Sequence, residues 1–284
     1  MIEILEQESE KMTDITDENI TQILKNINKT SEYDDFLVLI LKMKYKTDFS
    51  KREMFGISGF DYILNACENL NVKVIDYDGQ DDIIKIIKQN LDDKKYVLVL
   101  FSDTPLITKR TIYEILDYFT LKNLCALKFN RGFAFEQNYL RSVEKVYNPQ
   151  EQVFNEEDFV KVLDEHSFLN AINILKKRIL NYHMSNGVII KDFNGTFIDA
   201  KTNIEGGVVI ENNVVIRGKS LILKDSVISS NCCITNSIIE SNCKIENSIL
   251  ENCVVKSNSQ ILDFSVIKNQ TLEENTKLSN NKKI

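Results

Sequence analysis

The first candidate for chemistry is an aspartate that directly follows a buried strand. Residues 96–101 (YVLVLF) form a continuous apolar run of strand length, and Ser102-Asp103-Thr104-Pro105 comes next. A carboxylate at the carboxyl end of a parallel strand can hold Mg²⁺ against phosphate oxygens, because this cation prefers oxygen ligands. The same four residues are also typical of a turn that leads into a capped helix. Asp103 is therefore predicted to be either a metal ligand or a turn residue.

A group of basic residues follows another apolar run, residues 36–41 (FLVLIL). The segment LKMKYKTDFSK and the next residue carry Lys42, Lys44, Lys46, Lys51 and Arg52. Such a loop can attract phosphate, and Lys44 and Lys51 are the candidate phosphate-binding residues. The alternative is that these lysines are simply solvated. The segment contains no glycine, so its backbone N–H groups are not expected to form the close cradle of a glycine-rich loop.

Alternating strands and helices are expected to position both segments. Apolar runs predict strands at 36–41, 72–77, 96–101 and 125–129, and helical periodicity predicts helices at 60–70, 81–91 and 111–119. Strands buried on both faces and separated by helices indicate an α/β domain with a mainly parallel sheet. Ligands bind such sheets at the carboxyl ends of the strands, so the segments after Leu41 and Phe101 are expected to lie together.

The last third of the chain has a repeat of six residues. Isoleucine recurs seven times at this spacing from Ile198 to Ile234, with a small or β-branched residue two positions before each, and the pattern continues with some five-residue steps to about Leu278. A period of six fits neither a helix nor a free strand, but it fits a parallel β-helix with three short faces per coil. The alternative is a sandwich of short strands. Asparagine tolerates left-handed backbone conformations, so the corners are predicted at Asn212, Asn213, Asn231, Asn236, Asn242, Asn247, Asn252 and Asn258.

Composition narrows the class of protein. A chain of 284 residues can form two domains, and a net charge of −7 argues against general affinity for nucleic acid or an anionic membrane. There is no apolar run of membrane-spanning length, and the first residues do not resemble a signal peptide. Cys232, Cys243 and Cys253 fall in the small-residue position of the repeat, and no CxxC occurs. A reduced, cytoplasmic protein is predicted.

Three segments are expected. Residues 1–32 form an acidic extension in which Ile20, Ile23, Leu24 and Ile27 have helical spacing, which predicts either a docking helix or a solvated linker. Residues 33–186 form the α/β domain, and residues 187–284 form the β-helix.

Three stretches, in order, resemble one known family. They are similar to segments of the bifunctional N-acetylglucosamine-1-phosphate uridyltransferase/glucosamine-1-phosphate acetyltransferase family. The stretches are VLVLFSDTPLIT (residues 97–108), RGFA (131–134) with SVEKVYNPQEQ (142–152), and ILKKRILNYHMSNGVIIKDFNGTFIDAKTNI (174–204). The resemblance covers about residues 36–275. It implies a nucleotidyltransferase-like (Rossmann-like) domain followed by a left-handed parallel β-helix of hexapeptide repeats.

The resemblance fails at the positions that carry the family's chemistry. The family's LAAGxGTRM loop, its QxxxGTGHA segment and its NTG and GEYYLTD segments have no counterpart in this sequence. The family's second metal ligand falls at Leu163 or Asp164, and Asp164 could hold Mg²⁺ together with Asp103. The acetyltransferase histidine is absent from the coils, because His166 and His183 both precede them.

Selective loss of these residues predicts a degenerate, C-terminally truncated homologue. In this interpretation catalysis has been lost, and the chain is an oligomeric scaffold or a regulatory protein, with a trimer as the expected homo-oligomer. The alternative is an active Mg²⁺-dependent sugar-1-phosphate nucleotidyltransferase of the UDP-N-acetylglucosamine pyrophosphorylase type, with Asp103 and Asp164 on the metal and Lys44 or Lys51 on phosphate. A sugar nucleotide would then be the ligand. Acetyl transfer, nucleic-acid binding and membrane binding are not expected.

Overall fold

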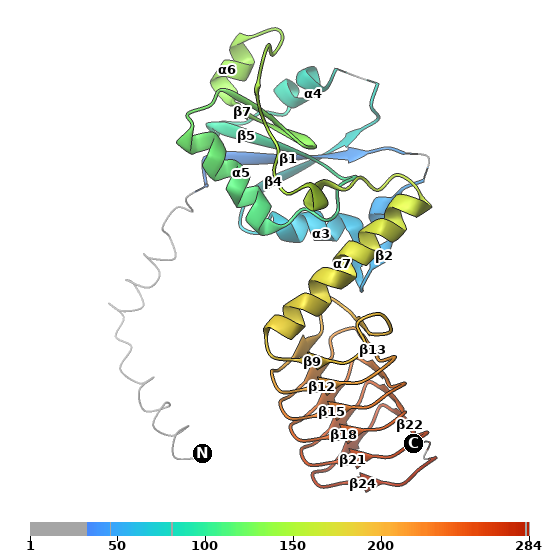
Figure 1. Ribbon diagram of the computed structural model, residues 1–284. Coiled ribbons are helices and arrows are strands. Elements are labelled where there is room, and N and C mark those ends of the chain that lie inside the picture. The colour runs from blue at the N-terminus through green and yellow to red at the C-terminus, as the bar shows by residue number, and fades with distance from the viewer. Residues whose placement is uncertain (1–32, 46, 81, 282, 284) are drawn as a thin grey trace, which may run out of the picture.

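The computed structural model describes residues 33–45, 47–80, 82–281 and 283. These residues form an α/β part and a coil of short strands, with helix α7 (Glu165–Ser185) lying between them (Figure 1). The helix predicted around Ile20 to Ile27 lies outside the described residues.

The α/β part is built on one six-stranded sheet. The strand order is β4 (Asn71–Tyr77), β1 (Phe36–Met43), β5 (Tyr96–Phe101), β7 (Gly132–Glu136), β6 (Ala126–Phe129) and β8 (Gln150–Gln152). β7 runs against its two neighbours, whereas the other five strands share one direction. The four predicted strands are confirmed. β7 and β8 were not predicted.

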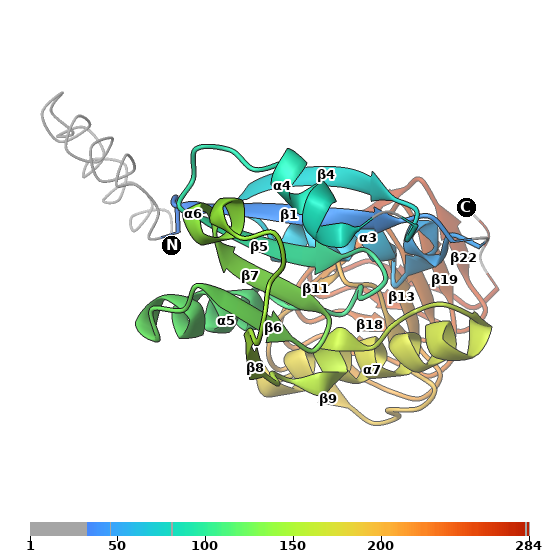
Figure 2. The ribbon, with the colours of Figure 1, turned by 90° about the horizontal axis from the view of Figure 1, so that it is seen from above.

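Helices cover both faces of this sheet (Figures 1 and 2). Side chains alternate along β1 and β5, so Val38 and Leu98 face one core cluster and Leu39 and Val99 face the other. α3 (Gly59–Ala66) and α5 (Lys109–Leu121) belong to the first cluster, and α4 (Ile83–Gln89) and α6 (Gln137–Ser142) to the second. The three predicted helices are confirmed with ends shifted by a few residues. The remaining elements are η1 (Phe49–Lys51), β2 (Glu53–Met54), β3 (Ile57–Ser58) and η2 (Glu156–Phe159).

The coil consists of three stacked parallel sheets, whose strand orders are β10-β13-β16-β19-β22, β11-β14-β17-β20-β23 and β24-β21-β18-β15-β12-β9. The strands are β9 (Ile189–Ile190), β10 (Phe197–Ile198), β11 (Asn203–Ile204), β12 (Val209–Ile210), β13 (Val215–Arg217), β14 (Leu221–Ile222), β15 (Val227–Ile228), β16 (Cys233–Thr235), β17 (Ile238–Ile239), β18 (Lys244–Ile245), β19 (Ile249–Glu251), β20 (Val254–Val255), β21 (Gln260–Ile261), β22 (Val266–Lys268), β23 (Thr271–Leu272) and β24 (Lys277–Leu278). The parallel β-helix predicted from the six-residue period is confirmed.

Stacked aliphatic side chains fill the axis of the coil. In the first sheet, Ile198, Ile216 and Ile234 lie in register and are completely buried, and Leu250 and Ile267 continue the same column. The small residue beside each one connects neighbouring coils. For example, the backbone N–H of Cys243 donates to Ser226 Oγ at 3.0 Å. The aliphatic side chain therefore supplies the core, and the small one lets the backbone turn closely beside it.

Asparagine forms most of the corners. Seven of the eight predicted corner asparagines have φ between +37° and +61°, and Asn212 is the exception. Their side chains also stack, because Asn213 Nδ2 donates to Asn231 Oδ1 at 2.8 Å and Asn242 Nδ2 donates to Asn258 Oδ1 at 2.7 Å. The corners are thus fixed both by backbone preference and by side-chain ladders.

Helix α7 covers the first coil. Its N-cap is Asp164, whose side chain accepts the backbone N–H of Ser167 at 2.8 Å in a capping box. Its residues Ala171, Leu175 and Ile179 belong to the same core cluster as the axial isoleucines of the coil. The helix therefore closes the top of the coil.

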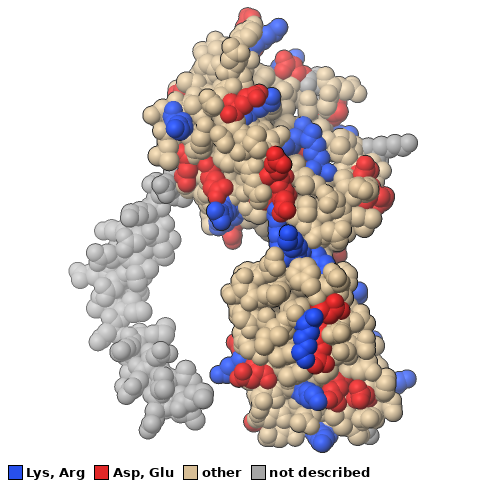
Figure 3. Space-filling model, viewed as in Figure 1, with Lys and Arg blue, Asp and Glu red and all other residues tan. Residues whose placement is uncertain are grey.

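Charged side chains of both signs are interspersed on the surface. On the face seen in Figure 3, Lys and Arg lie among Asp and Glu over both parts, without a broad patch of one sign. No helix within the described part of the chain is long and apolar enough to span a membrane.

Two neighbouring residues of β17 test this register. Ile239 is completely buried on the axis, whereas Ile238 points outward and is 39% exposed. Ile239→Asp is expected to unfold the coil, because an unpaired charge on the axis costs several kcal/mol. Ile238→Asp, the matched control, is expected to change stability by less than about 1 kcal/mol. Urea unfolding followed by circular dichroism measures both, and equal effects would contradict the register.

Candidate functional site

The two predicted loops meet at the carboxyl ends of β1 and β5. The backbone N–H of Ser102 donates to Leu41 O at 3.0 Å, and the backbone N–H of Met43 donates to Ser102 Oγ at 2.9 Å. These two hydrogen bonds continue the pairing of the strands by one residue. The expected meeting of the two loops at this edge is confirmed.

Asp103 is buried at this edge and is held by two side chains. Its side chain is 1% exposed. Arg131 donates from Nε to Oδ1 at 3.2 Å and from Nη2 to Oδ2 at 2.8 Å, and Tyr45 Oη donates to Oδ2 at 2.7 Å. The guanidinium also lies 3.9 Å from the centre of the Phe101 ring. Arg131 thus makes a bidentate ion pair and stacks on an aromatic ring at the same time.

The antiparallel strand β7 places Arg131 there. Gly132 lies opposite Leu100 in β5, so the residue before it lies next to the end of β5. A Cβ at position 132 would be 2.3 Å from the Phe129 ring and 2.6 Å from Val99 O, so only glycine allows this approach. The turn between β6 and β7 therefore delivers Arg131 to Asp103.

These contacts define the electrostatics of the site. Burial and the hydrogen bond to Asp103 raise the pKa of Tyr45 to about 12, so its hydroxyl stays protonated and donates. Both oxygens of Asp103 accept hydrogen bonds, and a cation is already in contact with them. A Mg²⁺ ion bound to Asp103 would meet the guanidinium as a like charge. The residues in this arrangement do not fit Mg²⁺.

The space beside Asp103 is small. A cavity of about 10 Å³ is lined by Tyr45, Asp48, Ser50 and Asp103, among other residues of the two loops and Val162. One water molecule needs about 10–15 Å³, whereas pockets for drug-sized ligands measure about 300–1,000 Å³. This cavity has room for about one water molecule.

The other candidate residues lie around this edge with partners of their own. Asp164 is the N-cap of α7, and hydrogen bonds from Ser167 hold the pKa of its carboxyl below the usual value. Lys44 Nζ lies 3.3 Å from Asp76, and Lys51 Nζ lies 3.2 Å from Asp48, which lines the small cavity. Among the described residues, no group of three or more His, Cys, Asp or Glu side chains is arranged to hold a metal ion. The phosphate and metal roles of these residues remain predictions.

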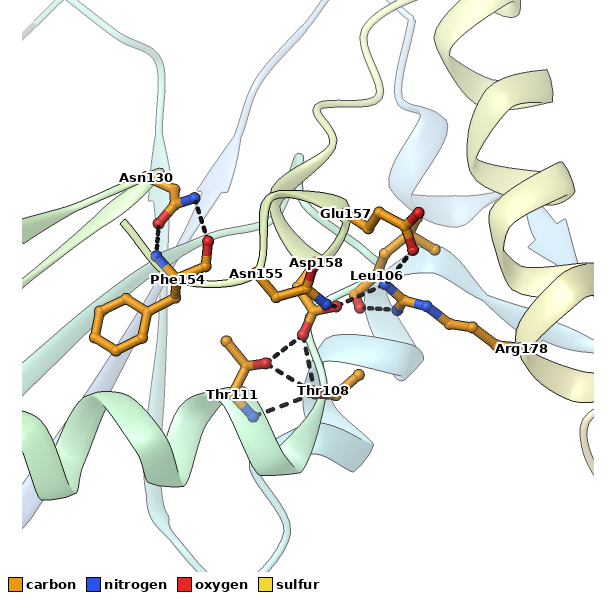
Figure 4. Close-up of polar contacts among 9 residues, drawn as sticks. All are labelled: Leu106, Thr108, Thr111, Asn130, Phe154, Asn155, Glu157, Asp158 and Arg178. Atoms are coloured by element: carbon orange, nitrogen blue, oxygen red, sulfur yellow. Dashed lines mark hydrogen bonds and ion pairs between the residues drawn. The ribbon is translucent and has the colours of Figure 1, made fainter. Parts of the chain in front are cut away.

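A second buried ion pair was missed by the sequence analysis (Figure 4). The buried carboxylate of Asp158 in η2 accepts from Arg178 Nη2 of α7 at 2.6 Å and from Thr108 Oγ1 at 2.9 Å. Thr111 of α5 and Asn155 also donate to it. Arg178 Nη1 donates to Leu106 O at 2.7 Å, in the segment that follows Asp103. These hydrogen bonds of Asp158 and Arg178, called the Asp158 clamp below, link α7 to the segment that carries Asp103.

The chain joins a six-stranded, mostly parallel α/β sheet to a parallel β-helix built from a six-residue repeat. Over much of its length its sequence is similar to those of the bifunctional GlmU proteins. The GlmU of Streptococcus thermophilus is 27% identical over 222 residues, which are 69% of this chain and 46% of the relative. The GlmU of Campylobacter jejuni is 30% identical over 163 residues, 56% of this chain and 38% of the relative. The chain thus spans about half the length of the curated relatives it matches, or less. No family model matches it.

Solved structures resemble the chain more weakly. The 4-diphosphocytidyl-2C-methyl-D-erythritol synthase of Anaerococcus prevotii covers 50% of this chain and all of its own, with 12% identity and a TM-score of 0.37. Rv0371c of Mycobacterium tuberculosis covers 50% of this chain and 98% of its own, with 9% identity and a TM-score of 0.38.

The pair of Asp103 and Arg131 can be tested by a double-mutant cycle. Arg131→Met leaves a buried carboxylate without its counter-ion and is expected to lower the free energy of unfolding by about 3–5 kcal/mol. Asp103→Asn combined with Arg131→Met is expected to cost less than the sum of the two single changes, because the two side chains are coupled.

Arg110→Met is the matched control, because Arg110 pairs with Glu114 on the surface of α5, where an ion pair contributes about 0–1 kcal/mol. Urea unfolding of wild type, the two single variants and the double variant measures the coupling, and Arg110→Met is unfolded beside them. An Arg131→Met protein as stable as the control would show that the pair does not hold the site.

Proposed function

We propose that this chain is a homologue of the GlmU proteins that has lost nucleotidyl transfer and acts as an oligomeric scaffold or a regulatory protein. The observation that carries the proposal is the guanidinium of Arg131 on Asp103, the residue to which the resemblance assigns the metal. In this proposal the guanidinium of Arg131 takes the place of the Mg²⁺ ion that an active transferase would bind at this carboxylate. The small cavity beside Asp103 supports the same conclusion.

Acetyl transfer is not part of the proposal. Both histidines lie in α7, before the coils, and burial lowers the pKa of His183 below its ordinary value. His183 is packed at the end of α7, and His166 lies in its first turn. Neither belongs to the coil faces on which such a base would have to lie.

An outward column of apolar residues supports oligomer formation through the coil. On the sheet that contains β16, β19 and β22, Cys233, Ile249 and Val266 lie in register on the outer side, and Ile249 is 46% exposed. Apolar residues on a flat outer face are typical of surfaces that bind another protein. We propose that this face joins copies of the chain in a trimer. We also propose that the protein works in a reducing, cytoplasmic compartment, which its six free cysteines support.

Calorimetry with UTP, with and without Mg²⁺, tests the loss of catalysis. Wild type and Asp103→Asn are both expected to give weak or no heat of binding in either condition, because Arg131 already pairs with the carboxylate in the wild type and the variant has no carboxylate to bind Mg²⁺. Release of pyrophosphate from nucleoside triphosphates and sugar 1-phosphates is expected to stay at background. The Streptococcus thermophilus GlmU serves as the positive control.

The active alternative makes the opposite prediction. Tight, Mg²⁺-dependent binding that Asp103→Asn abolishes, or pyrophosphate release above background, would overturn the proposal. A sugar nucleotide would then be the product class, and Asp103, Asp164, Lys44 and Lys51 would be the residues to change next.

Light scattering tests the oligomer. Wild type is expected to have three times the chain mass of 32.8 kDa at micromolar concentration. Ile249→Glu is expected to lower this mass, because it places a charge on the proposed interface. Lys277→Glu, on the outer side of another sheet, is the matched control and is expected to leave the mass unchanged. A monomeric wild-type protein at high micromolar concentration would contradict the trimer.

A further inference from the structure

A hollow lies between the β2–β3 hairpin and the first coils, away from the edge that carries Asp103. Its volume is about 420 Å³, within the range of about 300–1,000 Å³ typical of small-molecule sites. Its wall is mostly apolar and consists of Met54, Phe55, Ile172, Phe197, Val215 and Ile216. Three charged residues, Glu53, Asp199 and Arg217, complete the lining.

The hairpin that forms one side of the hollow has an unusual turn. Phe55 and Gly56 connect β2 to β3 with φ of +51° and +75°. A two-residue turn with two positive φ values favours Asn-Gly, and a bulky side chain at its first position is strained. The Phe55 ring stacks on Phe197 with ring centres 6.5 Å apart, and Phe55 O accepts the N–H of Ala200 at 3.0 Å. The strained turn therefore brings an aromatic ring to the hollow and joins the hairpin to the coil.

The charged groups of the hollow have unused bonding capacity. Within the described part of the chain, the carboxylate of Glu53 and the guanidinium of Arg217 make no ion pair or hydrogen bond, and both residues are exposed. Asp199 uses Oδ2 to accept the N–H of Gly218 at 2.8 Å, and Oδ1 has no such partner there. Phe197 remains 43% exposed beside them. The hollow thus offers two acceptors, one cationic donor and an apolar wall.

We propose that this hollow binds an α-amino acid with a large apolar side chain. The ammonium group donates to Glu53 and Asp199, the carboxylate binds the guanidinium of Arg217, and the side chain packs against Ile172 and Val215. A simple anion would meet two carboxylates, and a simple cation would meet Arg217. A purely apolar ligand would desolvate three charges without pairing them. A zwitterion with an apolar side chain satisfies every group of the lining.

The position of the hollow gives such binding a regulatory character. Glu53 and Phe55 belong to the α/β part, whereas Phe197 and Arg217 belong to the coil. A ligand that contacts both sides favours the docked hairpin, because binding to one conformation shifts the equilibrium toward it. The site is independent of Asp103, so it stands whether or not nucleotidyl transfer has been lost.

The experiment is a calorimetric screen of the full chain against the standard amino acids. Leucine, isoleucine, methionine and phenylalanine are expected to bind saturably and to raise Tm, whereas alanine and glutamate are not. For the amino acid that binds most tightly, the N-acetyl and the carboxamide derivatives are each expected to bind about tenfold or more weakly, because each loses one charged group and the charged hydrogen bonds that this group makes.

Substitutions show which charged group of the ligand each charged residue of the hollow binds. Arg217→Gln is expected to lower the affinity for the parent amino acid by about tenfold or more and to leave the affinity for the carboxamide unchanged. Glu53→Gln is expected to lower the affinity for the parent amino acid more than the affinity for its N-acetyl derivative. Both residues are exposed, so these variants keep the fold, and Arg110→Gln is the control that changes neither affinity.

Three results would overturn the proposal. The first is the absence of saturable binding of any standard amino acid at millimolar concentration. The second is binding that Arg217→Gln and Glu53→Gln leave unchanged. The third is a blocked derivative that binds as tightly as the parent amino acid.

Discussion

Aliphatic packing along the axis of the coil is the interaction on which both parts of the molecule depend. Each coil covers the isoleucines of the next, but the first coil has no coil above it. Helix α7 supplies the missing cover, and a fully buried aliphatic side chain contributes about 1.5–3 kcal/mol. The same helix carries Arg178, which binds Asp158 and Leu106 O. Helix α7 thus connects the packing of the coil to the segment in which Asp103 lies.

A buried carboxylate needs a counter-charge, and the choice of that charge decides what the edge can do. Lys44 and Lys51 of the neighbouring loop are exposed and pair with Asp76 and Asp48. Arg131 differs from them because the β6–β7 turn and the Phe101 ring hold it in place. A planar guanidinium can stack and make two parallel hydrogen bonds at once, which an ammonium group cannot. In the proposed function this fixed ion pair is a structural element and binds no metal.

The coil could be predicted from the sequence because its rules are local. One side chain in six lies on the axis, and asparagine favours left-handed corners wherever it stands. Long apolar runs predicted β1 and β5 for a similar reason. β7 was missed because GFAFE is short, begins with glycine and follows β6 after a tight turn. Arg131 reaches Asp103 only because β7 inserts between β5 and β6, so spacing along the chain could not reveal their contact. The Asp158 clamp was missed for the same reason, since it joins three segments that are distant in the sequence.

The corners of the coil also bear on how the protein ages chemically. An asparagine deamidates when the backbone nitrogen of the next residue attacks its side-chain amide carbon, closes a five-membered ring and expels ammonia. After Asn236, Asn242 and Asn252, that nitrogen donates its proton to a serine hydroxyl of the preceding coil, at 3.3, 3.0 and 3.0 Å. Its hydrogen bond and the fixed backbone oppose ring closure while the coil is intact. Aspartate and isoaspartate are therefore expected to form at these corners mainly while a coil is open, so their amount increases with the time that the coil has spent open.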